Sequence, residues 1–350
     1  MDISEILTFA KDQGASDLHI SSGEPPIVRI HGDIQKVDMP SLPKDDVHTM
    51  LYDILNDQQR KIFEEKKEID FALDLKGIAR YRVNAFYQSK GEAIVFRTIP
   101  TKVMTLEELG LPMILADLTK KTKGLVLVTG PTGSGKSTTL AAMMDYVNQN
   151  EKAHILTIED PIEFVYEPKQ SLINQRELGT NTHSFANALR SALREDPDVI
   201  LVGEMRDLET ISLAMTAAET GHLVFGTLHT SSAAKTVDRV IDVFPPEQQN
   251  QIRTMFSESI IAVITQNLLK KKDGKGRVAA LEIMIGTPAV RNLIREGKIA
   301  QIPGIMQTGK QFGMQTMDAT LVDMFKKGIV SKEAVTPYLT NPSVLSSYGV

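Results

Sequence analysis

The nine residues Gly130–Thr138, with the sequence GPTGSGKST, combine residue types and a spacing that can hold a chain of phosphates. They match the pattern G-x-x-x-x-G-K-[ST], in which the glycines let successive backbone N–H groups surround phosphate oxygens. The N-terminus of a following helix adds a favourable field for anions. We expect Lys136 to reach the β and γ phosphates and the Ser137 hydroxyl to bind Mg²⁺. The predicted binding loop is therefore Gly130, Pro131, Thr132, Gly133, Ser134, Gly135, Lys136, Ser137 and Thr138.

A second apolar run, VILVGE, ends in the carboxylate of Glu204. We expect Glu204 to reach Mg²⁺ through water, because no other acidic residue ends this strand. The preceding position, where many metal-binding strands of ATPases place a second acid, is Gly203. Another group must therefore activate the attacking water. The alternative for Glu204 is a plain surface residue at the end of a strand.

The run HILTIEDPIEF offers the missing acid, with Glu159, Asp160 and Glu163 close together. Pro161 ends the strand and forces a turn, so the carboxylates are presented on a loop. The carboxyl ends of such strands are where ligands of α/β sheets bind. We expect Glu163 to be the general base, because it lies beyond the turn and can swing toward a γ phosphate. A merely solvated acidic loop is the alternative.

The segment GHLVFGTLHT places His229 and Thr227 at the end of another apolar strand, where they could sense the γ phosphate. His222 stands before this strand, seven residues from His229, so the two face opposite sides and a shared zinc ion is not expected. Both histidines could instead have structural roles.

Arginines form a third group of candidates for transition-state stabilisation. A guanidinium supplied across a subunit boundary can stabilise charge that is spread over phosphate oxygens. A solvated sheet face is the alternative. The first candidates are Arg80 and Arg82, which alternate with apolar residues on one strand, and Arg97; the other candidates, which flank the metal-side strand, are Arg190, Arg194 and Arg206.

The elements that must position these residues follow two different patterns. Residues 1–100 contain a short amphipathic helix at 3–14, a helical stretch near 44–66 and short alternating strands, which predict an α+β domain. From Gly124 onward, unbroken apolar strands are mostly separated by helical segments, which predicts a parallel sheet covered on both faces. The expected strands are SDLHIS, PIVRIHG, IDFALDL, ARYRVNAF and AIVFRTI in the first part, and LVLVTG, HILTIED, VILVGE, LVFGTLHT and VAALEIM in the second. Residues 287–340 read as mostly helical, and Thr105–Glu108 has the spacing of a capping box that starts a helix.

Composition narrows the class of protein. A chain of 350 residues predicts two or more domains. It has no apolar run of the roughly 20 residues that a transmembrane helix needs, no pattern of a signal peptide, and no cysteine. The net charge is −5, which argues against a nucleic-acid partner. Residues 270–350 carry 12 basic and 6 acidic residues, and this part opens with KKKDGKGR, either a solvated hairpin turn or a docking surface.

Taken together, these motifs resemble those of the type II/IV secretion ATPase superfamily, and most of all its retraction ATPases of type IV pili. GPTGSGKSTTL resembles the family's Walker A motif, VILVGEMRD its atypical Walker B motif, and GHLVFGTLHT its His box. ILTIEDPIEF resembles its Asp box, whose final glutamate, the catalytic base, corresponds to Glu163. AVRNLIREGKI resembles a signature of the retraction motors, with Val290 in place of isoleucine. The cysteine-free chain also lacks the zinc insertion of the extension and secretion relatives.

The resemblance implies an α/β fold in which a RecA-like P-loop NTPase domain follows a PAS-like α+β domain and precedes a small helical region. We place the first domain at 1–98, a linker at 99–112, the ATPase domain at 113–286 and the C-terminal region at 287–350.

The implied function is an ATP- and Mg²⁺-dependent motor for pilus retraction and twitching motility. It would form a homohexamer in the cytoplasm, docked on the inner-membrane platform protein of the pilus. An accessory retraction paralogue, a nucleic-acid translocase and a non-hydrolysing scaffold remain as alternatives.

Overall fold

The computed structural model describes residues 2–30, 33–100 and 102–340, and the chain divides into two compact units. The first unit contains the residues up to Lys102 together with Glu163–Val165. The second contains the residues from Val103 to Ile162 and from Tyr166 onward. The final ten residues of the predicted C-terminal region, and His31 and Gly32 of one predicted strand, lie outside the described residues.

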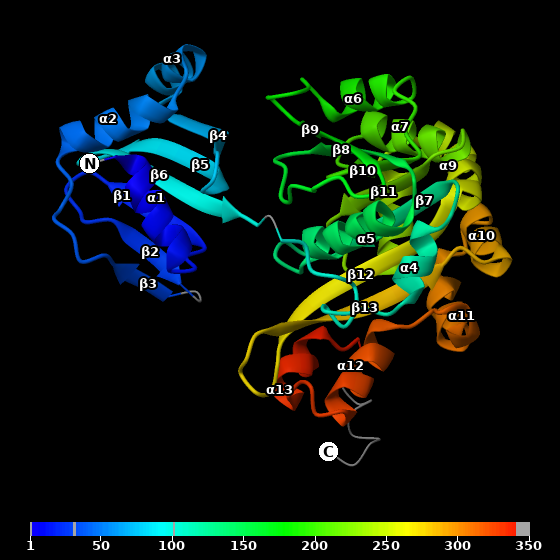
Figure 1. Cartoon of the computed structure of the whole chain (residues 1–350). Helices are drawn as coiled ribbons and strands as arrows, with labels where there is room; N and C mark the ends of the chain where they lie inside the picture. Colours follow the sequence, from blue (N-terminus) through cyan, green and yellow to red (C-terminus); the bar gives the residue numbers. More distant parts are fainter. Residues whose placement is uncertain (1, 31–32, 101, 341–350) are drawn as a thin grey trace. The chain divides into compact units, whose positions relative to one another are not determined.

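The first unit is a six-stranded sheet in the order β3-β2-β1-β6-β5-β4, with every neighbouring pair antiparallel. Its strands are β1 (Asp17–Ser21), β2 (Ile27–Ile30), β3 (Asp33–Lys36), β4 (Glu68–Leu75), β5 (Ala79–Gln88) and β6 (Gly91–Ile99). Its helices are α1 (Ile3–Asp12), α2 (Lys44–Ile54) and α3 (Asp57–Lys66). Figure 1 shows this unit in blue and cyan.

The core of the first unit lies on one face of this sheet, as the alternating sequence pattern predicts. Leu18, Phe96 and Val83 are cross-strand neighbours, and all three are buried in one cluster with the apolar sides of α1 and α2. The residues between them point to the other face, which carries charged side chains.

The second unit is a seven-stranded sheet in the order β13-β12-β7-β11-β10-β8-β9, in which all neighbouring pairs are parallel except β12 and β13. Its strands are β7 (Gly124–Thr129), β8 (His154–Glu159), β9 (Leu172–Glu177), β10 (Val199–Val202), β11 (Leu223–Leu228), β12 (Ile260–Lys270) and β13 (Arg277–Ile285). The central strands β7, β10 and β11 are buried along their whole length.

Helices cover both faces of the parallel strands, as expected for strands that are apolar throughout. On one face, α6 (Phe185–Ala192), α7 (Leu208–Glu219), α8 (Ala233–Asp242) and α9 (Pro246–Ser259) share one apolar cluster with the sheet. On the other face lies α5 (Lys136–Asn150), which contacts α4 (Ile114–Thr119) (Figure 1). The predicted α/β fold is confirmed.

Residues 287–340 are mostly helical, as predicted. The helices are α10 (Pro288–Arg295), α11 (Ile302–Thr308), α12 (Met317–Lys326) and α13 (Lys332–Val335), with short 3₁₀ turns at Ile299–Gln301, Lys310–Phe312 and Thr336–Tyr338. In the AVRNLIREGKI motif, Arg291 donates hydrogen bonds to the carbonyl oxygens of Gly286 (2.8 Å) and Ile260 (3.0 Å). Part of this motif therefore serves to fix α10 on the β12–β13 pair.

Two local predictions need correction. The capping box forms, with reciprocal hydrogen bonds between Thr105 and Glu108, but only a turn follows because Gly110 adopts a positive φ and Pro112 comes next. The VAALEIM strand (β13) is antiparallel to its neighbour, not part of a uniformly parallel sheet. The predicted helical stretch near 44–66 is confirmed as the two helices α2 and α3, and three strands were not predicted: β3, β9 and β12.

Among the described residues, no helix combines the length and apolar character that crossing a bilayer requires.

Two glycines, one after β13 and one in α11, differ in how much space a side chain would have. A Cβ on Gly286 would lie 2.3 Å from the Ile260 carbonyl oxygen, whereas a Cβ on Gly304, in α11, would meet no atom within 4 Å. We expect Gly286→Ala to destabilise the protein by about 1–3 kcal/mol, because the backbone must move. Gly304→Ala should stabilise it by about 0.5–1 kcal/mol, because alanine loses less entropy in a helix. Thermal unfolding midpoints that fall equally for both variants would contradict this packing.

Candidate nucleotide-binding site

The candidate residues of the second unit meet at one edge of its parallel sheet. Strand β7 leads into the phosphate-binding loop, and its neighbour β11 ends just before His229. Strand β10 leads to Gly203 and Glu204, and β8, beside it, ends at Glu159. Because these four strands are parallel, their carboxyl ends lie at the same edge, which is where α/β sheets bind ligands.

The loop Gly130–Gly135 has the backbone conformation that its glycines predict. Gly133 and Gly135 adopt φ angles of +78° and +89°, which residues with a side chain rarely adopt. Helix α5 then begins at Lys136, so Ser137 and Thr138 lie in its first turn. The N–H groups at this helix start have no partner within the helix, which suits them to bind anionic oxygens.

Lys136 is folded into this loop. Its Nζ donates hydrogen bonds to the carbonyl oxygens of Gly130 (2.9 Å) and Pro131 (3.1 Å), and the residue is buried. The ammonium is therefore held at the loop, at the start of α5. Phosphate oxygens arriving at the loop would give it stronger acceptors than these carbonyls.

The Glu204 carboxylate contacts two side chains that can carry a positive charge, Arg206 and His229. Its carboxylate is 3.0 Å from His229 Nε2 and is hydrogen-bonded to Arg206. Burial raises the pKa of the Glu204 carboxyl, but the hydrogen bonds and charges of Arg206 and His229 outweigh it, and the pKa lies below its usual value. A charged carboxylate at this position fits the predicted role of binding Mg²⁺ through water.

Position 203 leaves little room for a side chain. A Cβ on Gly203 would lie 3.1 Å from the Ile158 carbonyl oxygen and 3.2 Å from the Cα of Glu159. Glu159, on the neighbouring strand, also places its own Cγ only 3.6 Å from this position. The carboxylate of Glu159 is fixed by the Thr157 hydroxyl, which donates to Oε1 at 2.6 Å. A carboxylate therefore lies close to Gly203, supplied by the adjacent strand.

The acidic loop that contains Glu163 is held on both sides of that residue. Before it, the Ile162 N–H donates to Oε2 of Glu177 at 3.0 Å. After it, the Tyr166 N–H donates to Oε1 of Gln175 at 3.1 Å. Both acceptors are on the edge strand β9, so this strand fixes where the loop leaves and returns.

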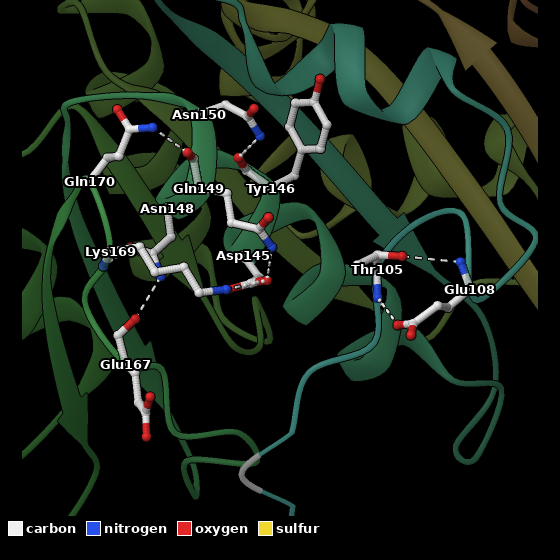
Figure 2. A network of polar contacts seen from close by, with 10 residues as sticks. All are labelled: Thr105, Glu108, Asp145, Tyr146, Asn148, Gln149, Asn150, Glu167, Lys169 and Gln170. Atoms are coloured by element: carbon white, nitrogen blue, oxygen red, sulfur yellow. Dashed lines mark hydrogen bonds and ion pairs between the residues drawn. The ribbon is translucent and has the colours of Figure 1, made fainter.

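The segment after this loop is also tied to α5, as Figure 2 shows. The Asn148 side chain donates to the Glu167 carbonyl (2.8 Å) and accepts from the Lys169 N–H (2.8 Å). Lys169 forms an ion pair with the buried Asp145 at 2.7 Å. The helix that starts at the phosphate-binding loop therefore also anchors the segment that follows Glu163.

The arginines of the first unit lie on the charged face of its sheet. Arg82 on β5 and Arg97 on β6 are direct cross-strand neighbours, and Arg80 pairs in register with Ile99. Arg97 Nε donates to the buried Asp17 at 2.9 Å, and Arg82 Nε lies 3.9 Å from Asp70. Two cations directly opposite each other destabilise a sheet, and the carboxylates of Asp17 and Asp70 offset part of this repulsion.

Arg190 and His222 have partners within the second unit. Arg190 pairs with Glu209, and the Nδ1 atom of His222 lies 3.0 Å from the Ala217 carbonyl at the end of α7. The structural alternative therefore accounts for His222. Thr227 donates to the carbonyl oxygen of Gly203 and so joins the ends of β11 and β10.

The sequence did not indicate three residues at this site. Gln266 bonds to the loop at Ser134 and to Thr139 in α5. Glu177 accepts from the Ile162 N–H. A signal existed for Gln266, because TQN interrupts the apolar run IIAVITQNLL.

Within the described residues, no three His, Asp or Glu side chains converge as a metal site. Mg²⁺ commonly uses one or two protein ligands and completes its coordination with substrate phosphates and water, so the expectation that Ser137 and Glu204 bind Mg²⁺ does not require such a cluster.

Comparisons with known proteins agree with this geometry. Residues 1–284 match the profile of a family described as type II/IV secretion system protein. The type IV pilus retraction ATPase PilT of Pseudomonas aeruginosa is 62% identical over 95% of this chain and 96% of its own length. The type IV pilus ATPase PilU of the same organism is 40% identical over 95% of this chain and 87% of its own. A crystal structure of the pilus retraction motor PilT with bound ADP has a TM-score of 0.93 and 47% identity, and covers 99% of both chains.

Introducing an acid at position 203 should lower the rate of ATP hydrolysis. We expect Gly203→Asp to lower MgATP turnover by about tenfold or more, because a new carboxylate beside Glu159 and Glu204 raises the pKa of its neighbours. Gly203→Ala adds the Cβ without the charge and should retain most activity, since the neighbours need to move by only a few tenths of an ångström. Steady-state hydrolysis rates test the pair, and a more active Asp variant would contradict this view of the site.

Proposed function

The chain belongs to the family of type II/IV secretion system proteins, and we propose that it is an ATP-hydrolysing motor that powers the retraction of type IV pili. The observation that most supports this proposal is the meeting of the phosphate-binding loop with the Glu204–His229 pair at one sheet edge. The chain that forms this edge resembles a retraction ATPase over almost its whole length. The much lower identity to PilU favours the principal motor over the accessory paralogue.

Binding of ATP uses the loop Gly130–Thr138. Backbone N–H groups of the loop and of the first turn of α5 surround the phosphates, and Lys136 exchanges its carbonyl acceptors for β and γ oxygens. Ser137 and, through water, Glu204 would hold Mg²⁺, which would neutralise charge on the phosphates. His229, held by Glu204, and the adjacent Thr227 respond to the presence of the γ phosphate.

Hydrolysis requires a base for the attacking water, and Glu163 has this role. Glu204 is committed to Arg206 and His229, and Glu159 to Thr157. Glu163 lies between the two anchored N–H groups of Ile162 and Tyr166, on a segment that strand β9 holds at both ends. Proton transfer to such a base typically contributes 10²–10⁴-fold to the rate, as an order of magnitude.

The arginines Arg80, Arg82 and Arg97 act in the site of a neighbouring subunit. The cross-strand pair Arg82 and Arg97 offers two guanidinium groups to one anion, and oxygens of a triphosphate would relieve their mutual repulsion. Such arginines can contribute 10³–10⁵-fold to turnover, as an order of magnitude.

This mechanism fits a homohexameric ring that docks on an inner-membrane platform protein at the cytoplasmic face of the membrane. The segment 99–112 links the domain at 1–98 to the ATPase domain at 113–286, which the region 287–350 follows. ATP-driven movement about this linker would transmit force. A nucleic-acid translocase would need a basic groove, whereas residues 1–269 are acidic overall. Stimulation of turnover by single-stranded DNA would favour that alternative, and the absence of any steady-state turnover would favour a scaffold.

The role of Glu163 gives a first prediction. We expect Glu163→Gln to retain MgATP affinity but to lower kcat by about 10²–10⁴-fold, because the amide cannot accept the proton. Glu167→Gln is the matched control, since only the main-chain carbonyl of Glu167 bonds to Asn148 and its carboxylate points away in Figure 2. In cells, the Glu163→Gln strain should accumulate pili that do not retract.

If Glu163→Gln turns over normally while Glu204→Gln alone is inactive, the base is assigned to the wrong strand. If pili fail to assemble instead of accumulating, the proposed direction of movement is wrong.

The arginines give a second prediction. Arg82→Ala rings and Lys136→Ala rings should each be inactive, but mixed rings should recover part of the activity. In a mixed ring, an intact loop can face an intact arginine of a neighbouring subunit. ATPase rates across a series of mixing ratios test this, with Lys44→Ala, an exposed cation at the start of α2, as the control partner. Rates that only average the two parents would exclude action across subunits.

A further inference from the structure

Gln266 on β12 is buried against the phosphate-binding loop, although no motif in the sequence includes it. We propose that Gln266 is a positioning residue that sets the shape of this loop for phosphate binding. The inference rests on the proposed nucleotide site and adds to it a residue from a different strand.

The register of β12 beside β7 brings Gln266 to the loop. The two strands pair in parallel up to Thr265 and Thr129, whose hydroxyl oxygens are 2.9 Å apart. One residue further on, β7 has turned into the loop at Gly130, while β12 continues straight. The main chain of β12 then lies so close that a Cβ on Gly130 would be 2.3 Å from the Gln266 carbonyl oxygen.

The Gln266 side chain connects the loop to the helix that follows it. Its Nε2 donates to the Ser134 carbonyl oxygen at 2.7 Å, and its Oε1 accepts from the Thr139 hydroxyl at 2.7 Å. A carbonyl oxygen can only accept, so the amino group must face Ser134 and the amide has one orientation. The Thr139 hydroxyl reinforces this orientation from the opposite side.

Holding the Ser134 carbonyl also directs the next N–H group. In a trans peptide the C=O and the following N–H point in opposite directions. When the Ser134 carbonyl points toward β12, the Gly135 N–H points away from β12, to the side where phosphate oxygens must lie. The same contact explains Gly135, because a Cβ there would be 2.7 Å from Gln266 Nε2.

The expected consequence is a change in affinity more than in catalysis. A preorganised N–H group bonds phosphate oxygens equally in the bound substrate and in the transition state, so its loss raises KM and leaves kcat nearly unchanged. A higher KM with an unchanged kcat differs from the effect expected when Glu163 is replaced, which is a lower kcat. It also differs from the effect of replacing a residue that only packs the core, which would lower stability without a specific change in KM.

The test is Gln266→Met, which keeps the length of the side chain and removes both hydrogen bonds. MgADP affinity by calorimetry should fall about tenfold to a hundredfold, with a matching rise in the KM for MgATP. The matched control is Gln315→Met, which removes another amide-to-carbonyl bond, from Gln315 Nε2 to Leu281 at 2.8 Å, away from the loop. It should lower the melting temperature without changing MgADP affinity.

Thr139→Val provides a second variant that leaves Gln266 in place and should weaken MgADP binding a few-fold. If Gln266→Met binds MgADP as the wild type does, or if it does not fold and Thr139→Val binds normally, the inference is overturned. Lys136→Ala distinguishes an error about Gln266 from an error about the nucleotide site. If that variant also binds MgADP normally, the nucleotide site itself is wrong, whatever the role of Gln266.

Discussion

The parallel register of β7, β11, β10 and β8 is the constraint on which the site depends. These strands pair residue by residue along buried, apolar stretches, so their carboxyl ends cannot shift relative to one another without exposing core side chains. Each strand then contributes a different polar group at the same edge: the phosphate-binding loop, His229, Glu204 and Glu159. The chemistry comes from residues distant in sequence, while the sheet core fixes how far apart they are.

This register also accounts for the distribution of acids. At the end of β10 the main chain of β8 is so near that position 203 accommodates a side chain only with adjustment, and glycine fits without it. The neighbouring carboxylate of Glu159 is then committed to Thr157, and that of Glu204 to His229 and Arg206. The proposed mechanism therefore assigns the activation of water to an acid outside the strand ends, Glu163, and β9 anchors the loop that carries it through Ile162 and Tyr166.

Much of the fold could be predicted because the strands of the parallel sheet are apolar on both faces and separated by helices. The edge strand β9 could not, since its LINQRE sequence is partly polar and its burial alternates. Nor could β12, which follows α9 directly, with no turn residue between Ser259 and Ile260. The loop motif could be recognised from the sequence, because the spacing of its residues is local. Gln266 lies more than a hundred residues away, and only the pairing of β12 with β7 brings it there.

The same β12–β13 pair also joins the nucleotide edge to the C-terminal helices. Glu282 on β13, beside Thr265, is partly buried, and this burial raises the pKa of its carboxyl even though two main-chain N–H groups donate to it. One belongs to Ala233 at the start of α8 (2.7 Å), shortly after His229, and the other to Met317 at the start of α12 (3.2 Å). Breaking these two hydrogen bonds is costly, because each N–H at a helix start would lose its acceptor. The segment that follows His229 and helix α12 are therefore held by a single side chain, and displacement of either one strains the other.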